Sequence, residues 1–163
     1  MKVRDVARPP ISVLPQNATL KDVLDKFLKH HLDSLPIIDA AQRVVGLITI
    51  DVLVDVFLPR YHEILRDLSA LQDKGQLASL FNQAFAGLDP HHEKLILAAD
   101  VMNSHLRWIP ADCSLLEAAA DLQAQKQKRL PVVDKDRKLV GMISDFEVIL
   151  ALLQGSKVSS VAV

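Results

Sequence analysis

The most distinctive chemical pair in the sequence is a hydroxyl followed three residues later by a carboxylate, Ser144 and Glu147. The pair ends an apolar run that predicts a strand and begins a run with helical spacing. Free backbone N–H groups at such a junction favour an anion such as phosphate. The carboxylate, one helical turn further on, can accept two charge-assisted hydrogen bonds from a diol. The same spacing is also a capping box, which needs no ligand, and the two roles are compatible.

Earlier in the chain, the hydroxyl of Thr49 also follows an apolar run, but the residue three positions later is Val52 and not a carboxylate. Asp51 comes one residue too early, which turns it about 100° around a helix. A valine side chain offers no hydrogen bond to a ligand. We therefore expect at most one competent site of this kind, at Ser144 and Glu147.

Other polar and aromatic residues carry weaker signals. Lys126, Lys128 and Arg129 form a small basic cluster, and cations at a helix C-terminus are favourable without any ligand. Trp108 is the only tryptophan, and a role in the core or an interface is the simpler alternative to stacking on a ligand. Both residue sets stay open at this point between a structural and a ligand-binding role.

The sequence contains histidines and a cysteine, but none of them is spaced from a second suitable residue as in known catalytic or metal-binding motifs. The adjacent histidines 30–31 and 91–92 would point in different directions on a helix. No second cysteine or carboxylate cluster completes a zinc set, and Cys113 is expected to pack as a small apolar residue. The sequence contains no nucleophile elbow, P-loop or dinucleotide-binding glycine motif. We expect no enzyme activity, no metal and no required cofactor.

Composition narrows the class of protein further. The chain has 163 residues, half of them hydrophobic, with 19 basic and 20 acidic side chains. It can therefore form one domain or two small halves with a core. The near-neutral charge disfavours nucleic acid as a partner. No run of about 18 uncharged apolar residues occurs, and no signal peptide is evident. We expect no membrane insertion and a cytoplasmic location, which the single cysteine also fits.

The sequence repeats itself with an offset of 95 residues. Leu-Pro-Ile-Ile-Asp at 35–39 recurs as Leu-Pro-Val-Val-Asp at 130–134. Val-Gly-Leu-Ile-Thr at 45–49 recurs as Val-Gly-Met-Ile-Ser at 140–144. Because several matches share one register, chance is a poor explanation. The chain therefore contains two copies of one structural unit.

Each copy predicts strand, helix, strand, strand and helix. In the first copy the strands are expected at 11–14, 35–39 and 44–49, and the helices at 19–29 and 51–57. The apolar positions of the motif strands should form the core: Leu35, Ile37, Val45, Leu47, Ile48, Leu130, Val132, Val140, Met142 and Ile143.

Local signals set the limits of these units. Thr19 with Asp22, and Ser114 with Glu117, predict N-terminal capping boxes. Between the copies, helical spacing broken by Gly75 predicts an inserted helical hairpin. The last residues are small and polar and should fray. The expected division is a first repeat at 1–58, the insert at 59–98, a second repeat at 99–154 and a flexible tail at 155–163.

The tandem motifs L-P-h-h-D and h-G-h-h-T/S, where h is hydrophobic, resemble a pair of CBS domains, a tandem also called a Bateman module. The family is named for the regulatory region of cystathionine β-synthase. The resemblance covers about 110 residues, everything except the insert and the tail. It implies an α+β fold of two pseudo-symmetric β-α-β-β-α repeats around a pseudo-twofold axis. It also implies a cleft on each side of the axis and frequent dimerisation.

In that family the clefts bind AMP, ADP, ATP, S-adenosylmethionine or dinucleotides as regulatory ligands. The resemblance implies that Ser144 and Glu147 contact the ligand, Glu147 through its ribose, and that Arg129 stands where some relatives bind phosphate. It implies that the segment from Val6 to Ser12 lines the cleft, although Arg8 and Asn103 replace a threonine that often contacts the ligand. The expected ligand-binding residues are Ser34, Pro36, Thr49, Arg129, Pro131, Val132, Ser144 and Glu147.

Two functions remain in competition. The chain could be a regulatory sensor of an adenosyl ligand, with the helical insert as its reporter or as a docking surface for an effector protein. Alternatively, it could be a homodimeric scaffold with vestigial nucleotide sites. Val52, Arg8 and Asn103 favour the scaffold, whereas Ser144 and Glu147 favour the sensor. A free-standing protein and a part of a larger one are both compatible with the sequence.

Overall fold

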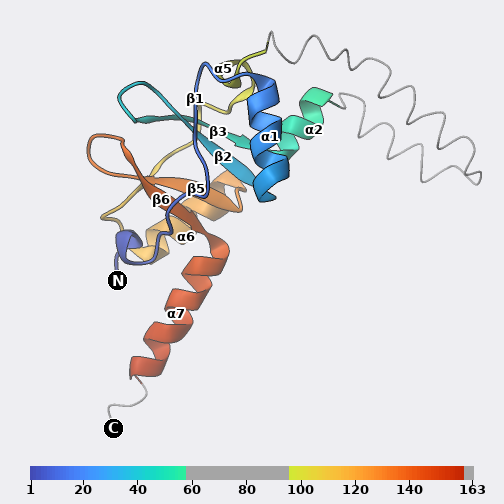
Figure 1. Cartoon of the computed structure of the whole chain (residues 1–163). Coiled ribbons are helices and arrows are strands. Elements are labelled where there is room, and N and C mark those ends of the chain that lie inside the picture. Colours follow the sequence, from blue (N-terminus) through green and yellow to red (C-terminus); the bar gives the residue numbers. More distant parts are fainter. Residues whose placement is uncertain (58–95, 160–163) are drawn as a thin grey trace, which may run out of the picture.

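The structure, a computed structural model, describes residues 1–57 and 96–159 (Figure 1). The first repeat forms β1 (Leu14–Pro15), α1 (Leu20–His30), β2 (Ser34–Ile38), β3 (Val44–Thr49) and α2 (Ile50–Phe57). The second forms β4 (Ile109–Pro110), α6 (Leu115–Gln125), β5 (Arg129–Val133), β6 (Leu139–Ser144) and α7 (Asp145–Ser159). Short helices precede them: η1 (Val3–Asp5) and α5 (Ala98–Val101). The helical hairpin expected at 59–98 lies outside the described residues except for its last positions.

Each repeat contains a three-stranded sheet, and the two sheets have the same topology. The central strand β2 pairs parallel with β1 and antiparallel with β3, and β5 pairs in the same way with β4 and β6. The register also recurs at the offset of the sequence repeat, since Pro36 lies opposite Leu47 and Pro131 opposite Met142. The predicted α+β fold of two matching repeats is therefore confirmed.

The first strand of the first repeat is shorter and later than expected. The apolar run at 11–14 predicted a strand, but β1 consists only of Leu14 and Pro15, and the Ile11 residue is 63% exposed. A strand needs a hydrogen-bonded neighbour. Only Leu14 and Pro15 lie opposite residues of β2, and the chain before them leaves the sheet.

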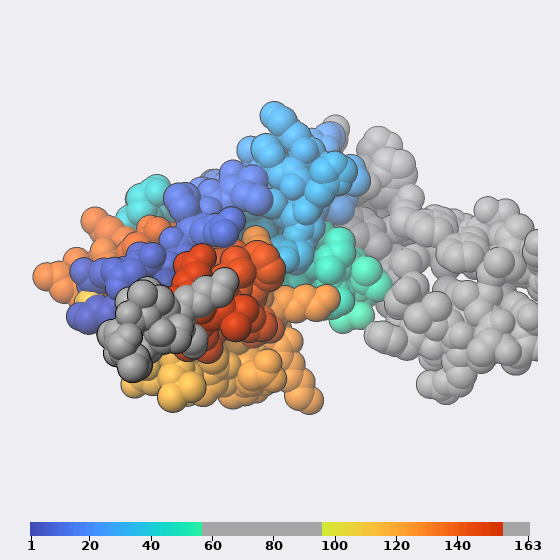
Figure 2. Space-filling model, turned by 90° about the horizontal axis from the view of Figure 1, so that it is seen from below, coloured from blue at the N-terminus to red at the C-terminus, as the bar shows by residue number. Residues whose placement is uncertain are grey.

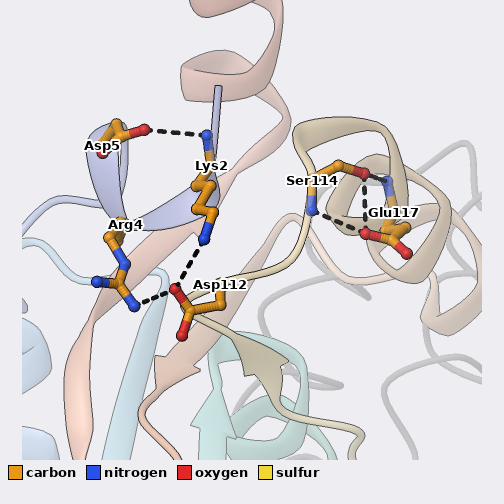
Figure 3. Close-up of polar contacts among 6 residues, drawn as sticks. All are labelled: Lys2, Arg4, Asp5, Asp112, Ser114 and Glu117. Carbon is orange, nitrogen blue, oxygen red and sulfur yellow. Dashed lines mark hydrogen bonds and ion pairs between the residues drawn. The ribbon is translucent and has the colours of Figure 1, made fainter.

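The two predicted capping boxes are confirmed. The Asp22 N–H donates to the Thr19 hydroxyl over 3.2 Å, and the Asp22 carboxylate accepts from the Thr19 N–H over 2.9 Å. Ser114 and Glu117 make the same pair of bonds at the start of α6, at 3.2 and 2.8 Å (Figure 3). Hydrogen bonds from the Ser114 N–H, and then from its hydroxyl, hold the pKa of Glu117 below its usual range.

The segment that precedes the first strand of each repeat packs on the other repeat. The Val3 N–H donates to the carbonyl of Cys113 over 3.0 Å, and the Ala98 N–H donates to that of Ala18 over 2.8 Å. These two bonds are related by the offset of 95 residues. Further along, Arg8 bridges to Met142 of β6, and Asn103 bridges to Leu47 of β3. The repeats are thus joined by a reciprocal exchange of backbone segments.

The motif glycines are required by this exchange. A Cβ atom on Gly141 would lie 2.8 Å from the carbonyl oxygen of Arg8 and 3.2 Å from the Cβ of Ala7. A Cβ atom on Gly46 would meet the side chain of Met102. At both positions the lack of a side chain lets the exchanged segment lie directly against the edge strand.

Ion pairs strengthen only one of the two exchanges. The guanidinium of Arg4 and the ammonium of Lys2 both reach the carboxylate of Asp112, the latter over 3.4 Å (Figure 3). In the space-filling view the N-terminal residues, in dark blue, lie against the red helix α7 (Figure 2). The offset places Leu97, Ala99 and Asn17 at the matching positions, where no such ion pair can form.

Two hydrophobic clusters form the core, one in each repeat, and they meet where Leu47 of β3 packs into the cluster of the second repeat. The predicted core residues are buried with two exceptions. Val45 is only partly buried, and Val140 is 45% exposed. The two valines are related by the offset, and each falls at a register shift of its antiparallel pair. The extra residue of such a bulge has no partner and turns away from the core.

The last helix, α7, continues beyond residue 154, the expected end of the second repeat, to Ser159. Adding a residue to an existing helix gains one backbone hydrogen bond, and the segment 155–159 contains no proline. Within the described ranges, no helix combines the length and apolar character that crossing a bilayer would require.

We predict that Gly141→Ala destabilises the fold by about 1–3 kcal/mol, because the new methyl group collides with the backbone of Arg8. Urea unfolding of the purified protein measures the change. A matched Gly46→Ala variant should be less costly, because its closest neighbour is a flexible methionine side chain. Equal stability of Gly141→Ala and the unmodified protein would contradict the close approach.

We predict that Glu117→Gln lowers the free energy of unfolding at pH 7, and that this deficit shrinks as the solution is acidified. The lowered pKa of Glu117 stabilises the fold above the carboxyl's unfolded pKa of about 4.3, and this contribution is lost as the pH falls through the folded value. Denaturant titrations between pH 7 and pH 2 test this. Asp136→Asn is the control, since its side chain accepts no hydrogen bond among the described residues. A deficit that is constant with pH would exclude the proposed cause.

Candidate functional site

A cavity of about 220 Å³ lies between the two repeats. One wall is the exchanged N-terminal segment, Arg8 to Ser12. The others come from both repeats: Leu32, Ser34 and Pro36 on one side and Arg129, Met142 and Glu147 on the other. Four of the residues expected at a ligand site, Ser34, Pro36, Arg129 and Glu147, are therefore brought together here. We refer to this space as the main cavity.

Glu147 is held in the wall of the main cavity by the start of α7. Its residue is 7% exposed, and its Oε2 accepts the Ser144 N–H over 2.9 Å as well as the Ser144 hydroxyl. Ser144 immediately precedes α7, so the pair forms the carboxylate half of a capping box. Ser144 itself is buried and does not line the main cavity, so its role there is to orient the carboxylate.

The other carboxylate oxygen of Glu147 faces Arg8. The Nε of Arg8 lies 3.5 Å from Oε1, and the arginine side chain is 66% exposed. The backbone of Arg8 is fixed by two hydrogen bonds to Met142, of 2.9 and 2.7 Å. The resemblance placed Arg8 within the segment expected to line the cleft, as a departure from a threonine, but nothing local in the sequence paired it with Glu147. Its counterpart at the offset of 95 is Asn103, and the position equivalent to Glu147 is Val52, which carries no carboxylate.

A second, smaller cavity of about 110 Å³ adjoins the main one and shares Ser34 and Arg129 with it. We call it the axial cavity, because Ser34 and Arg129 are equivalent positions of the two repeats. Three cations line it, Lys126, Lys128 and Arg129, together with the carboxylates Asp33 and Asp51. Arg129 is partly buried, with its Nη1 3.8 Å from Asp33 Oδ1. Thr49 lines this cavity and not the main one.

A third recess of about 270 Å³ adjoins the main cavity elsewhere and shares Arg8 and Glu147 with it. We call it the outer recess. It is lined by Met1, Asp5 and Val6 and by Leu150, Ala151 and Gln154 of α7. The main cavity thus borders the outer recess at Arg8 and Glu147. It borders the axial cavity at Ser34 and Arg129.

Two expected site residues lie elsewhere. Val132 is fully buried in the core of the second repeat, and Pro131 is buried opposite Met142 in the sheet. Neither lines the main cavity, the axial cavity or the outer recess. Neighbouring strand residues point to opposite faces, so Val132 faces the core. Pro131 is the counterpart of Pro36 and therefore belongs to the other, pseudo-equivalent side of the axis.

The pseudo-equivalent side carries different chemistry on the same backbone. The offset replaces Glu147 by Val52, Arg8 by Asn103 and Met142 by Leu47. Leu47 is fully buried, and Asn103 uses its side-chain oxygen to accept the His105 N–H over 3.0 Å. Of the two equivalent positions, 147 and 52, only position 147 carries a buried carboxylate.

Trp108 and Cys113 fit structural roles. The guanidinium carbon of Arg137 lies 5.9 Å from the centroid of the Trp108 ring, within range of a cation–π contact. Trp108 does not line any of the three cavities. Burial, and then the carboxylates of Glu117 and Asp121, raise the pKa of the Cys113 thiol. Among the residues that the structure describes, no group of three histidine, cysteine or acidic side chains is arranged to hold a metal.

Comparison with known proteins gives one family for both repeats. The sequence model of the CBS domain matches residues 3–58 and again 98–154. A curated relative, the chloroplastic CBS domain-containing protein CBSX1 of Arabidopsis thaliana, is 28% identical over 148 residues. The match covers 88% of this chain and 60% of that protein, so the chain spans less than two thirds of the relative.

Solved structures of CBS pairs share the fold. The crystal structure of CBSX2 in complex with AMP has a TM-score of 0.67 and 24% identity, covering 95% of this chain and 98% of that one. The CBS domain pair of MJ0100, in complex with 5′-methylthioadenosine and S-adenosyl-L-methionine, has a TM-score of 0.62 and 19% identity. That match covers 96% of this chain and 98% of the other.

Proposed function

Because the chain belongs to the CBS domain family and carries two copies of the domain, we propose that it is a regulatory module that senses an adenosyl ligand in its main cavity. Two relatives of the same fold were crystallised with such ligands, AMP in one and 5′-methylthioadenosine with S-adenosylmethionine in the other. The CBS domain is a regulatory unit, and we propose that this chain catalyses no reaction and requires no cofactor. We also propose that the protein is located in the cytoplasm.

The observation that carries the proposal is the buried carboxylate of Glu147 in the wall of a cavity built from both repeats. Ser144 holds one oxygen of Glu147 and leaves the other directed toward Arg8. A ribose hydroxyl would donate to this second oxygen, while capping of the helix continues through the first.

The phosphate end of the ligand is assigned to Arg129. This side chain borders both the main and the axial cavity, so a phosphate there would meet Arg129 first, with Lys126 and Lys128 beyond it. Thr49 and the first residues of α2 line the same axial cavity, where the partial positive charge of the helix N-terminus favours an anion and the carboxylates of Asp33 and Asp51 oppose one. Lys126 also ends α6, so the helix-end interpretation of the cluster is compatible with ligand binding. The longer the phosphate chain, the more of these cations it would contact.

Binding in this cavity would act on the relation between the repeats. Its walls belong to the N-terminal segment, β2, β5, β6 and α7, so a ligand contacts both repeats at once. A ligand shifts a conformational equilibrium only by its difference in affinity for the two states. We propose that the segment between the repeats, expected at 59–98, passes this shift to an effector protein.

A homodimeric scaffold is the second candidate, and a surface of α7 favours it. Phe146, Ile149 and Leu153 follow one helical face and are 62%, 54% and 58% exposed. Leu116 at the start of the neighbouring helix α6 is also exposed. An apolar helix face open to water is typical of a surface that a partner covers. We propose that a second copy of the chain packs there, which is compatible with ligand binding on the inner side of α7.

We predict that at least one of AMP, ADP, ATP and S-adenosylmethionine stabilises the purified protein, and that Glu147→Ala removes most of this effect. A ligand at 100 times its Kd should raise the free energy of unfolding by about 2.7 kcal/mol, a shift of several degrees in Tm. Thermal-shift titration provides the measurement. Glu117→Ala is the matched control, since it also removes a capping carboxylate but lies outside the three cavities.

Two results would count against the sensor. No shift with any of the four ligands at millimolar concentration would leave the scaffold as the function. Unchanged affinity of Glu147→Ala, alongside normal binding by the unmodified protein, would show that the ligand binds elsewhere.

We predict that the protein is a dimer in solution and that Phe146→Asp with Ile149→Asp converts it to a monomer, because charges replace the apolar face of α7. Light scattering coupled to size-exclusion chromatography measures the mass. Lys135→Asp, in the exposed turn between β5 and β6, should remain dimeric. A monomeric unmodified protein, or a double variant that still dimerises, would rule out this interface.

A further inference from the structure

Arg8 gives the main cavity a feature that recognition of a plain ribose does not need. Both oxygens of Glu147 are already engaged, Oε2 by the N–H and hydroxyl of Ser144 and Oε1 by Arg8. A ribose diol prefers a carboxylate with acceptor positions left open for two hydroxyl groups. In Glu147, one acceptor position remains open for a hydroxyl group, on Oε1 beside the guanidinium of Arg8. The ribose end of the cavity therefore presents a cation together with a carboxylate.

The guanidinium is well placed to receive an anion. Its backbone is anchored to Met142 by two hydrogen bonds, and its Nε is oriented by Glu147. Within residues 1–57 and 96–159, Glu147 is the sole acidic group paired with Arg8, and most of the arginine side chain is exposed. The two terminal nitrogens can therefore form the paired hydrogen bonds that a planar guanidinium makes to phosphate.

We propose that Arg8 makes this cleft selective for adenine nucleotides that carry a phosphate ester on the ribose, at the 2′ or 3′ position, in addition to the 5′ phosphate. The inference rests on the proposed function, because it takes the ribose to lie beside Glu147. One remaining ribose hydroxyl donates to Glu147, and the ester on the other oxygen binds Arg8. In dinucleotide-binding sites, an arginine near the ribose likewise accommodates a phosphate on the 2′ oxygen.

The arrangement of the cavities agrees with a ligand that has two separated anionic groups. Arg8 stands at the border with the outer recess, and Arg129 at the border with the axial cavity. The nucleoside would occupy the main cavity between them, with the 5′ phosphate at Arg129 and the ribose phosphate at Arg8. The outer recess leaves room beyond Arg8 for the ester.

Calorimetric titration of the full chain tests the proposal with three probes that each carry two phosphates: ADP, adenosine 3′,5′-bisphosphate and adenosine 2′,5′-bisphosphate. At least one bisphosphate should bind about tenfold more tightly than ADP, which corresponds to about 1.4 kcal/mol. Comparing the two isomers tells which ribose oxygen carries the ester. Arg8→Ala should abolish the preference, and Arg8→Lys should restore part of it by returning the charge without the planar fork.

Arg4→Ala is the control, because Arg4 belongs to the same exchanged segment and pairs with Asp112 but lines none of the three cavities. It should keep the preference. If ADP binds as tightly as both bisphosphates, or if folded Arg8→Ala keeps the preference, this inference is overturned while the sensor stands. If none of the three probes, nor AMP, ATP or S-adenosylmethionine, binds, the proposed function fails and the inference with it.

Discussion

The reciprocal exchange of backbone segments between the two repeats is the constraint on which the rest of the structure depends. Each three-stranded sheet has two edge strands, and one of them, β3 or β6, pairs with the segment that precedes the other repeat's first strand. An uncovered edge would present unpaired N–H and C=O groups. The exchange satisfies some of them and lets the clusters meet at Leu47. It also carries Arg8 to the side of Glu147, so the cavity exists because the repeats are joined in this way.

The exchange is symmetric in its backbone and asymmetric in its side chains. Hydrogen bonds between main-chain groups recur at the offset of 95 residues, because they require no particular side chain beyond the glycines that permit close approach. The side chains at the two clefts take no part in these backbone hydrogen bonds, so they can differ between the repeats. Glu147 and Arg8 face one side of the axis, and Val52 and Asn103 occupy the equivalent positions. One fold therefore provides two chemically different surfaces from one repeated plan.

Helix α7 links the two proposed roles physically. Its first turn places Glu147 in the wall of the main cavity, while Phe146 and Ile149 on the same helix remain exposed to solvent. A rigid helix transmits a displacement along its length, so a change at the cavity would also move the exposed face. Sensor and dimer are for this reason compatible descriptions of the same element, and ligand binding and assembly would be thermodynamically linked if both use it.

Interactions between residues close together in the chain could be predicted from the sequence, whereas contacts between residues far apart in the chain could not. The repeat was visible as matching motifs at one offset. The strand at Val44–Thr49 and the capping boxes at Thr19 and Ser114 depend on neighbours a few residues away, so residue spacing predicted them. Glu147 was also predictable, because its motif with Ser144 is local. The strand at 11–14, the burial of Val140 and the placement of Val132 depended on register and on strand neighbours, which spacing does not specify. The resemblance implied that the segment from Val6 to Ser12 lines the cleft, but only the tertiary structure paired the Arg8 side chain with Glu147, because the exchange that joins them spans most of the chain.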